Sequence, residues 1–231
     1  MTTLLVGTTG FPGRRERFPA ADLHAVDLPE TADQRLKPRT LARWRAQTPE
    51  TVRFVARART DVTHPSPGKP GSGHFRDSDV VRGAWAETVE AARALEAAAL
   101  LLRTPPSFTP TTGHRATLGA FVSGAAEDLP GVSLIWEPRG VWEDEEVAEW
   151  ASEAGLIPSV DPQRTIPPPG EEAFFRLGGS GGVRSRYDDL ELLDVLARAA
   201  EHQRCWVLFD HLDMLRDALR LALLAKEADG R

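Results

Sequence analysis

The stretch Val132 to Trp142, with the sequence VSLIWEPRGVW, joins an apolar strand to a charged end. Its first residues are apolar apart from one serine, which is typical of a strand buried on both faces in a parallel sheet covered by helices. Pro138 lacks the backbone N–H that a strand ladder uses, so we expect the strand to end there, with Glu137 and Arg139 at its carboxyl end. Helix-forming residues follow from Glu143 to Ala154. An apolar strand, a charged end and then a helix form the unit that constrains the whole fold.

The same unit recurs along the chain. Short apolar runs predict eight strands at Leu4–Val6, Leu23–Leu28, Val52–Ala58, Ala98–Leu102, Val132–Glu137, Ile157–Val160, Ala173–Leu177 and Cys205–Phe209. Helical patterns cover Thr40–Gln47, Asp79–Ala97, Leu118–Leu129, Glu143–Ala154, Asp188–Glu201 and Met214–Ala228. Parallel strands need crossover connections, and eight of them can close without leaving an edge. We therefore expect one domain, residues 1–231, folded as a TIM-type (β/α)8 barrel.

Proline and glycine interrupt this pattern at three places. Residues Phe11–Asp22 and Pro162–Glu172 are the only links between strands one and two and between strands six and seven. Both are short, and the second contains three consecutive prolines, so neither has room for a packed helix. The outer ring of helices is therefore expected to be incomplete. The third place, His64–Asp77, is rich in proline and glycine and is predicted to be a mobile loop or lid.

One motif favours a different fold. Gly7, Gly10 and Gly13 follow the first strand, and Asp27 lies about 20 residues further on, as in a dinucleotide-binding site. Such a site needs a helix whose N-terminus faces the pyrophosphate. Residues 14–19 are instead polar, short and broken by proline. The glycines therefore indicate a tight turn.

Composition is that of one enzyme-sized globular domain. The chain has 231 residues, of which 41% are hydrophobic and 27% charged. A net charge of −6 without blocks of like charge indicates no nucleic-acid or membrane partner. The lone Cys205 excludes an internal disulfide, no apolar run reaches membrane length, and the N-terminus does not resemble a signal peptide. We predict a cytoplasmic protein, with its oligomeric state left open.

Six motifs in order along the chain carry a family resemblance: GTTG, TLARWRAQTPETVRFVARA, LLLRTPPSF, WEPRGVW, FFRLGGSGGVRSRY and FDHLDMLRDALRL. Together they resemble the YecE-like proteins, catalogued as domain of unknown function 72, over nearly all of the chain. The resemblance implies a TIM-type barrel and no established reaction. It places the family's polar positions at the barrel lip at Asp27, Arg57, His64, Glu137, Arg139, Asp161, Arg176 and Tyr187.

The chain departs from the family pattern at several of these places. Relative to the family's usual residues, it has Asp27 for Glu, Pro29 and its neighbours for an Asn and aromatic residues, Arg57 for Lys, Arg103 for Gln, Gly178 for His, and Asp210-His211 for an Asn pair. The resemblance alone therefore does not imply an activity for this chain.

The barrel itself predicts a polar mouth, because the loops at the carboxyl ends of the strands converge there. The residues expected at that end are Asp27, Arg57, Arg103, Glu137, Arg139, Asp161, Arg176 and Asp210. Arginine suits the capture of phosphate or carboxylate, and burial could set Glu137, Asp161 and Asp27 apart as acid and base. A purely structural network of opposite charges is the alternative. We expect Arg176, Glu137 and Arg139 to act as one site.

A glycine run after strand seven is a second anion-binding candidate. Its exposed backbone amides, together with flanking arginines, are suited to phosphate, and a flexible loop without a ligand is the alternative. The substrate-binding residues predicted from these features and the resemblance are Arg57, His64, Arg103, Arg139, Arg176, Gly179, Ser180, Gly181, Gly182, Tyr187 and Asp210.

Other chemistries have weaker signals. The six histidines show no metal-ligand spacing, so zinc is not indicated and no metal ligand or cofactor is assigned. Ser107 lacks the surroundings of a nucleophile elbow, and Cys205 lies in an apolar strand. We predict an enzyme, a hydrolase or lyase acting on a small anionic ligand that is carboxylated or phosphorylated. The alternatives are a divalent-metal-dependent enzyme acting on phosphodiesters and a non-catalytic binding or scaffold protein.

Overall fold

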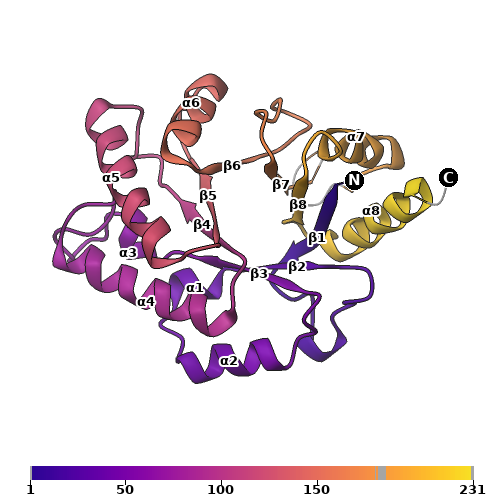
Figure 1. Ribbon diagram of the computed structural model, residues 1–231, viewed down its shortest axis with the longest axis horizontal. Helices are drawn as coiled ribbons and strands as arrows, with labels where there is room; N and C mark the ends of the chain where they lie inside the picture. The colour runs from indigo at the N-terminus through magenta and orange to yellow at the C-terminus, as the bar shows by residue number, and fades with distance from the viewer. Residues whose placement is uncertain (1, 180, 182–185, 230–231) are drawn as a thin grey trace. The chain divides into compact units, whose positions relative to one another are not determined.

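Eight parallel strands form a closed barrel in chain order. The computed structural model describes residues 2–179, 181 and 186–229 (Figure 1). The strands are β1 Thr3–Thr9, β2 Ala25–Leu28, β3 Arg53–Arg57, β4 Ala99–Arg103, β5 Ser133–Glu137, β6 Ile157–Val160, β7 Glu172–Leu177 and β8 Arg204–Phe209. Each predicted strand is present, within a few residues of its expected bounds, and the TIM-type barrel is confirmed.

The chain forms two compact units. The first consists of Met1–Asp27, Gln47–Arg53 and Ser159–Arg231, and the second of Leu28–Ala46 and Phe54–Pro158. The prediction of a single domain over the whole chain stays a prediction.

The first unit contains β1, β2, β7 and β8 with two long helices, α7 (Asp189–Ala199) and α8 (Met214–Asp229), which lie side by side (Figure 1). Their apolar faces bury a core that includes Phe175, Val207 and Leu221. The close approach of β1 to β2 explains a glycine in the middle of β1. A Cβ atom at Gly7 would lie 1.8 Å from the carbonyl oxygen of Ala25.

The second unit contains β3, β4 and β5 with six helices among its described residues. These are α1 Glu30–Asp33, α2 Pro38–Ala46, α3 Thr60–Thr63, α4 Asp79–Leu95, α5 Thr112–Asp128 and α6 Asp144–Ala154. Local capping signals set the ends of the longer ones: Ser78 accepts a hydrogen bond from the Val81 amide at the start of α4, and Glu143 forms a capping box with Glu146 at α6. Across the described part of the chain, every helix is too short or too polar to cross a bilayer.

Both predicted gaps in the helix ring are confirmed. Between β1 and β2 the chain forms only the 3-10 turn η1 (Arg15–Arg17), and the residues between β6 and β7, all of them described, form no helix. The glycine motif after β1 is therefore a turn and not the start of a dinucleotide-binding helix. Gly10 and Gly13 have φ of 69° and 106°, and the Gly10 amide donates to the Asp27 carbonyl at 2.6 Å.

Two details of the sequence prediction were wrong. Helix α5 begins at Thr112 and not at Leu118, because Thr111 caps it by accepting from the His114 amide although its first turns lack an apolar stripe. The short helices α1 and α3 were not expected. Both are single turns of four residues that tertiary contacts hold, so they carry no periodic pattern.

The segment predicted to be a mobile lid is well connected. Asp61 accepts hydrogen bonds from Ser66 Oγ at 3.0 Å and from Lys69 Nζ at 2.5 Å, and its carbonyl accepts from the Gly73 amide at 2.8 Å. Phe75 is 4% exposed and packs against Phe108. These contacts argue against a loosely attached loop, and its mobility stays a prediction.

Candidate functional site

In the first unit, Arg176 is the centre of a network of buried charges. It lies on β7, and its Nη2 donates to Asp27 Oδ2 at 2.9 Å. Its Nη1 donates to Thr9 Oγ1 at 2.9 Å and to Asp210 Oδ2 at 3.3 Å. The pairing of β1 with β2 places Thr9 directly beside Asp27, so strand register assembles this group. We call Thr9, Asp27, Arg176 and Asp210 the Arg176 network.

The Arg176 network carries more negative than positive charge. Its single guanidinium faces two carboxylates, and the side chains of Asp27 and Arg176 are only 0% and 9% exposed. A buried ion pair with this many contacts holds its members in place. An incoming phosphate would have to compete with Asp27 and Asp210 for the same guanidinium. The network is therefore better suited to holding β1, β2 and β7 together than to capturing an anion.

One backbone amide of the glycine run after β7 is hydrogen-bonded within the protein. The Gly179 amide donates to the hydroxyl of Tyr187 at 3.0 Å, so this amide is used within the chain, and Gly181 is exposed. Burial raises the pKa of Tyr187 to about 12, with a further contribution from the charge of Asp161. Predicted residues Ser180 and Gly182, and the flanking Arg184, lie outside the described residues.

Asp161 follows β6, and its surroundings favour the protonated form of its carboxyl group. Burial raises its pKa, against the opposing effects of the Gln163 amide, which donates to Oδ1 at 3.1 Å, and of Arg164, whose Nε lies 3.2 Å from Oδ2. A raised pKa favours the protonated carboxyl group, the form that a general acid needs.

The second unit contains the other charged group, built around Glu137 at the end of β5. Strand register places Arg103 at the end of β4 directly beside Glu137. Arg103 Nε lies 3.0 Å from Glu137 Oε1, and its Nη2 donates to Oε2 at 3.2 Å. Arg139 Nη2 donates to Oε1 at 2.6 Å. Arg103, Glu137, Arg139 and the nearby His64 are called the Glu137 cluster below.

The charged side chains of the Glu137 cluster differ in how deeply they are buried. The Glu137 side chain is 7% exposed, whereas those of Arg103 and Arg139 are 28% and 51% exposed. The carboxylate therefore lies at the bottom, and two guanidinium groups lie above it. Within these three side chains, two positive charges meet one negative charge.

His64 adds a neutral ring to this cluster. Burial lowers its pKa, the charge of Arg103 lowers it further, and Asp33 opposes both. Its Nδ1 lies 2.7 Å from Thr63 Oγ1. Arg57, predicted at the same end of the barrel, is buried on β3, where its backbone N–H donates to Thr31 Oγ1 at 2.7 Å.

The loops that carry the cluster are fixed by close packing. Gly140 has φ of 103°, and a Cβ atom there would lie 2.9 Å from the Cα of Pro106. Trp142 Nε1 donates to the Phe108 carbonyl at 3.1 Å. The loops after β4 and β5 are thus held against each other, which keeps Arg103 and Arg139 close to Glu137.

The structure brings together only part of the predicted site. Glu137 is in contact with both Arg139 and Arg103 in the second unit. The hypothesis of one site required the contact with Arg139 and did not include Arg103. Arg176 contacts Thr9, Asp27 and Asp210 in the first unit, and its joint action with Glu137 stays a prediction.

Sequence reasoning missed a further pair of polar side chains, Ser107 and His74. Ser107 Oγ lies 2.9 Å from His74 Nε2, although the two residues are 33 positions apart. No motif signals this pair, since the segment with His74 was interpreted as a mobile loop and the surroundings of Ser107 match no nucleophile elbow. Among the described residues, no group of three histidine, cysteine or acidic side chains is arranged to hold a metal ion.

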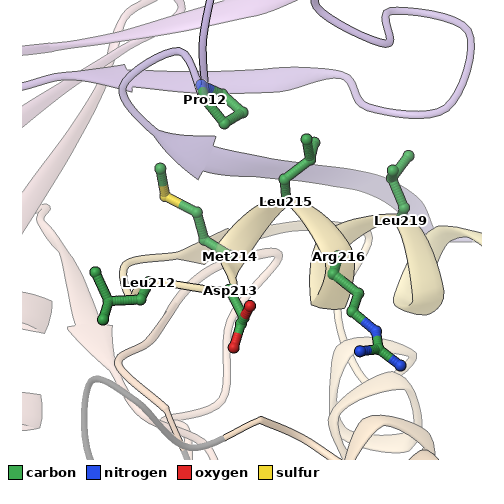
Figure 2. Close-up of a pocket in the computed structure, with 7 residues that line it drawn as sticks. All are labelled: Pro12, Leu212, Asp213, Met214, Leu215, Arg216 and Leu219. Carbon is green, nitrogen blue, oxygen red and sulfur yellow. The ribbon is translucent and has the colours of Figure 1, made fainter.

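A pocket of about 420 Å³ lies beside the start of α8. Its lining residues are Pro12, Leu212, Asp213, Met214, Leu215, Arg216 and Leu219. Figure 2 shows the methionine and the two helical leucines pointing toward Pro12, while Asp213 and Arg216 point away. None of the predicted site residues lines this pocket, so it is separate from the chemistry above.

A closed barrel of eight parallel strands, with polar side chains at their carboxyl ends, defines a TIM-barrel protein. The chain belongs to the family described as protein of unknown function DUF72, whose model matches residues 17–230. This confirms the YecE-like resemblance.

Similar solved structures agree with this assignment. A DUF72 family protein from Enterococcus faecalis V583 has 17% identity and a TM-score of 0.70, with 100% of this chain and 99% of that chain covered. One from Thermotoga maritima MSB8 has 17% identity and a TM-score of 0.68, with 97% and 99% covered. A xylose isomerase domain containing protein from Salmonella typhimurium LT2 has 10% identity and a TM-score of 0.61, with 99% and 96% covered. Among curated proteins, none matches the chain.

Proposed function

We propose that this chain is an enzyme, a hydrolase or lyase, that binds a carboxylated or phosphorylated small molecule at the Glu137 cluster. The observation that carries the proposal is that two partly exposed guanidinium groups share one deep carboxylate. An anion can add at the half-exposed Arg139 without displacing Glu137. Arginine is suited to the task because its planar N–H groups match the oxygens of carboxylate and phosphate.

Arg139 is the side chain that supports this proposal most directly. It uses one Nη on Glu137 and is half exposed, so its other N–H groups remain available to a ligand. Glu137 orients Arg139 before the ligand arrives, which reduces the entropy lost on binding. The two guanidinium groups also orient the Glu137 carboxylate, which in this proposal accepts a proton from the bound substrate.

A thermal-shift titration with inorganic phosphate, sulfate and small phosphorylated or carboxylated molecules tests the binding. An anion at ten times its Kd stabilises the folded state by about 1.4 kcal/mol, or roughly 3–6 °C in Tm for a chain of this size. Arg139→Ala should remove the shift. Arg204→Ala is the matched control, because Arg204 starts β8, pairs with Glu172 and is 53% exposed, close to the 51% of Arg139.

The outcome against the proposal is a wild-type Tm that does not respond to any of these anions at millimolar concentration. An equal loss of the shift in both variants would show a general charge effect and would also contradict it. With a bound ligand identified, Glu137→Gln should retain binding and lose turnover. Binding that survives with no turnover of any ligand would favour the non-catalytic alternative.

The remaining sequence hypotheses stay predictions. The metal-dependent phosphodiester alternative is tested by metal analysis of the purified protein and by activity with added divalent ions. A cytoplasmic location and the lack of nucleic-acid and membrane partners rest on composition alone.

A further inference from the structure

Ser107 and His74 form a hydroxyl–imidazole pair in the second unit. Ser107 lies in the loop after β4 and is exposed, while His74 is buried. Ser107 Oγ is 2.9 Å from His74 Nε2, the separation of a serine hydrogen-bonded to a general base. With the ring proton on Nδ1, Nε2 accepts the hydroxyl proton of Ser107.

The backbone holds His74 in an uncommon conformation. His74 and Phe75 have φ of 55° and 54°, in the left-handed region that residues other than glycine seldom occupy. Two hydrogen bonds keep them there, from the His74 amide to the Thr63 carbonyl and from the Phe75 amide to the Val62 carbonyl, both at 3.0 Å. Residues in such strained backbone conformations cluster at active sites and ligand-binding sites, where the backbone fixes the direction of a side chain.

The surroundings keep the His74 ring neutral. Burial lowers its pKa, and electrostatic interactions with His114, Arg76 and His64 lower it further. His114 reaches the ring from α5, with the two ring centres 4.9 Å apart. A neutral imidazole at pH 7 can accept the proton of a hydroxyl, as a general base must.

The pair is adjacent to the Glu137 cluster. The residue before Ser107, Pro106, packs against Gly140, which directly follows Arg139. Arg103 begins the loop that carries Ser107 four positions later. The loops that carry Ser107 and Arg139 are therefore in contact, so a substrate whose anionic group binds Arg139 can extend toward Ser107.

We propose that Ser107 is a nucleophile activated by His74, and that the pair hydrolyses esters. This rests on the proposed function only for the anionic group of the substrate. Ser107 Oγ forms a bond to the acyl carbon while its proton moves to His74 Nε2. The acyl–oxygen bond of the ester breaks, and His74 returns the proton to the departing alkoxide. Water then attacks the acyl group with its proton passing to His74, which gives that proton back to Ser107 as the acid leaves.

Labelling with diisopropyl fluorophosphate, an uncharged reagent, tests the dyad without a known substrate. The activated hydroxyl forms an oxygen–phosphorus bond, fluoride leaves, and His74 takes the proton. Mass spectrometry of the intact protein and its peptides should find one label, on Ser107. Ser123→Ala is the matched control, because Ser123 is an exposed serine of α5 that bonds to the Gly119 carbonyl and has no histidine partner.

His74→Asn is the variant that removes the base with least harm to the fold, because asparagine tolerates the left-handed conformation. It should lower the labelling rate at least tenfold, while Ser123→Ala leaves the rate unchanged. In the wild type the rate should rise with pH to a plateau, with a midpoint below the ordinary histidine value of about 6.5. This pH profile provides a second measurement should His74→Asn fail to fold.

Absence of a label on wild-type Ser107, or an undiminished rate in folded His74→Asn, would overturn the inference. A labelling rate without a histidine midpoint would overturn it as well. Arg139→Ala separates the two proposals. It should abolish stabilisation by anions but leave labelling by the uncharged reagent intact, so either proposal can fail while the other stands.

Discussion

Removing Arg176 should destabilise the protein far more than removing an exposed arginine. In Arg176→Ala, Asp27 loses its 2.9 Å partner while its side chain stays fully buried. Thr9 Oγ1 also loses the hydrogen bond that Arg176 Nη1 donates. A buried carboxylate that loses a cation at this distance loses much of the stabilisation that offsets its removal from water.

The size of the effect follows from these contacts. Breaking one side of a buried ion pair costs about 3–5 kcal/mol, which corresponds to a fall in Tm of roughly 6–20 °C for a chain of this length. The exposed pair of Arg204 with Glu172 sets the comparison, and Arg204→Ala should cost less than about 1 kcal/mol.

A double-mutant cycle assigns the loss to the pair. In the Asp27→Asn background, Arg176→Ala leaves no carboxylate at position 27. It should therefore cost roughly 1–3 kcal/mol less than in the wild type. Urea denaturation of the four proteins gives each free energy of unfolding from the midpoint and slope. The reasoning is refuted if Arg176→Ala costs no more than Arg204→Ala, or if the two substitutions are additive.

Two further predictions address the environment of Tyr187 and the glycine in β1. Tyr187 is the one tyrosine of the chain, so an absorbance titration of tyrosinate should give a native pKa of about 12, because burial disfavours the phenolate. The stability gained from the neutral phenol is complete below the unfolded value of about 10 and is lost as pH rises toward 12, and a native midpoint near 10 would contradict the burial. Gly7→Ala should unfold the protein or cost several kcal/mol in urea denaturation, since the added Cβ would lie 1.8 Å from a backbone oxygen. Gly124→Ala in α5, where a Cβ meets open space, should instead stabilise it by about 0.5–1 kcal/mol, and similar effects of the two substitutions would exclude this explanation.

The barrel was predictable from sequence because each strand has a clear local signature. An apolar run such as that of β5 ends at proline or charge, and the link between β6 and β7 is too short and too rich in proline for a packed helix. The start of α5 was missed because its first turn is polar, and only the Thr111 cap marks it.

The pairing of charges was beyond the sequence. Arg176 and Asp27 are 149 positions apart, and only the closed sheet brings them into contact. Eight charged residues at one end of the barrel allow many pairings, and strand register decides among them, as it does for Arg103 and Glu137. Proline and glycine content predicts irregular backbone between His64 and Asp77 but does not show whether that backbone is packed, and Phe75 in this segment is buried.

The anion preference proposed for the Glu137 cluster depends on a residue in which this chain departs from the YecE-like pattern. Where that pattern has glutamine, the chain has Arg103, which reaches both oxygens of Glu137. A glutamine there could donate to Glu137 without adding charge, and Glu137 with Arg139 would then be a neutral pair. Arg103 thus brings a second guanidinium group to the carboxylate that Arg139 also contacts. Two arginines at the ends of β4 and β5 are thus expected of this chain in particular, and a phosphate or carboxylate is the kind of ligand that arginine side chains bind.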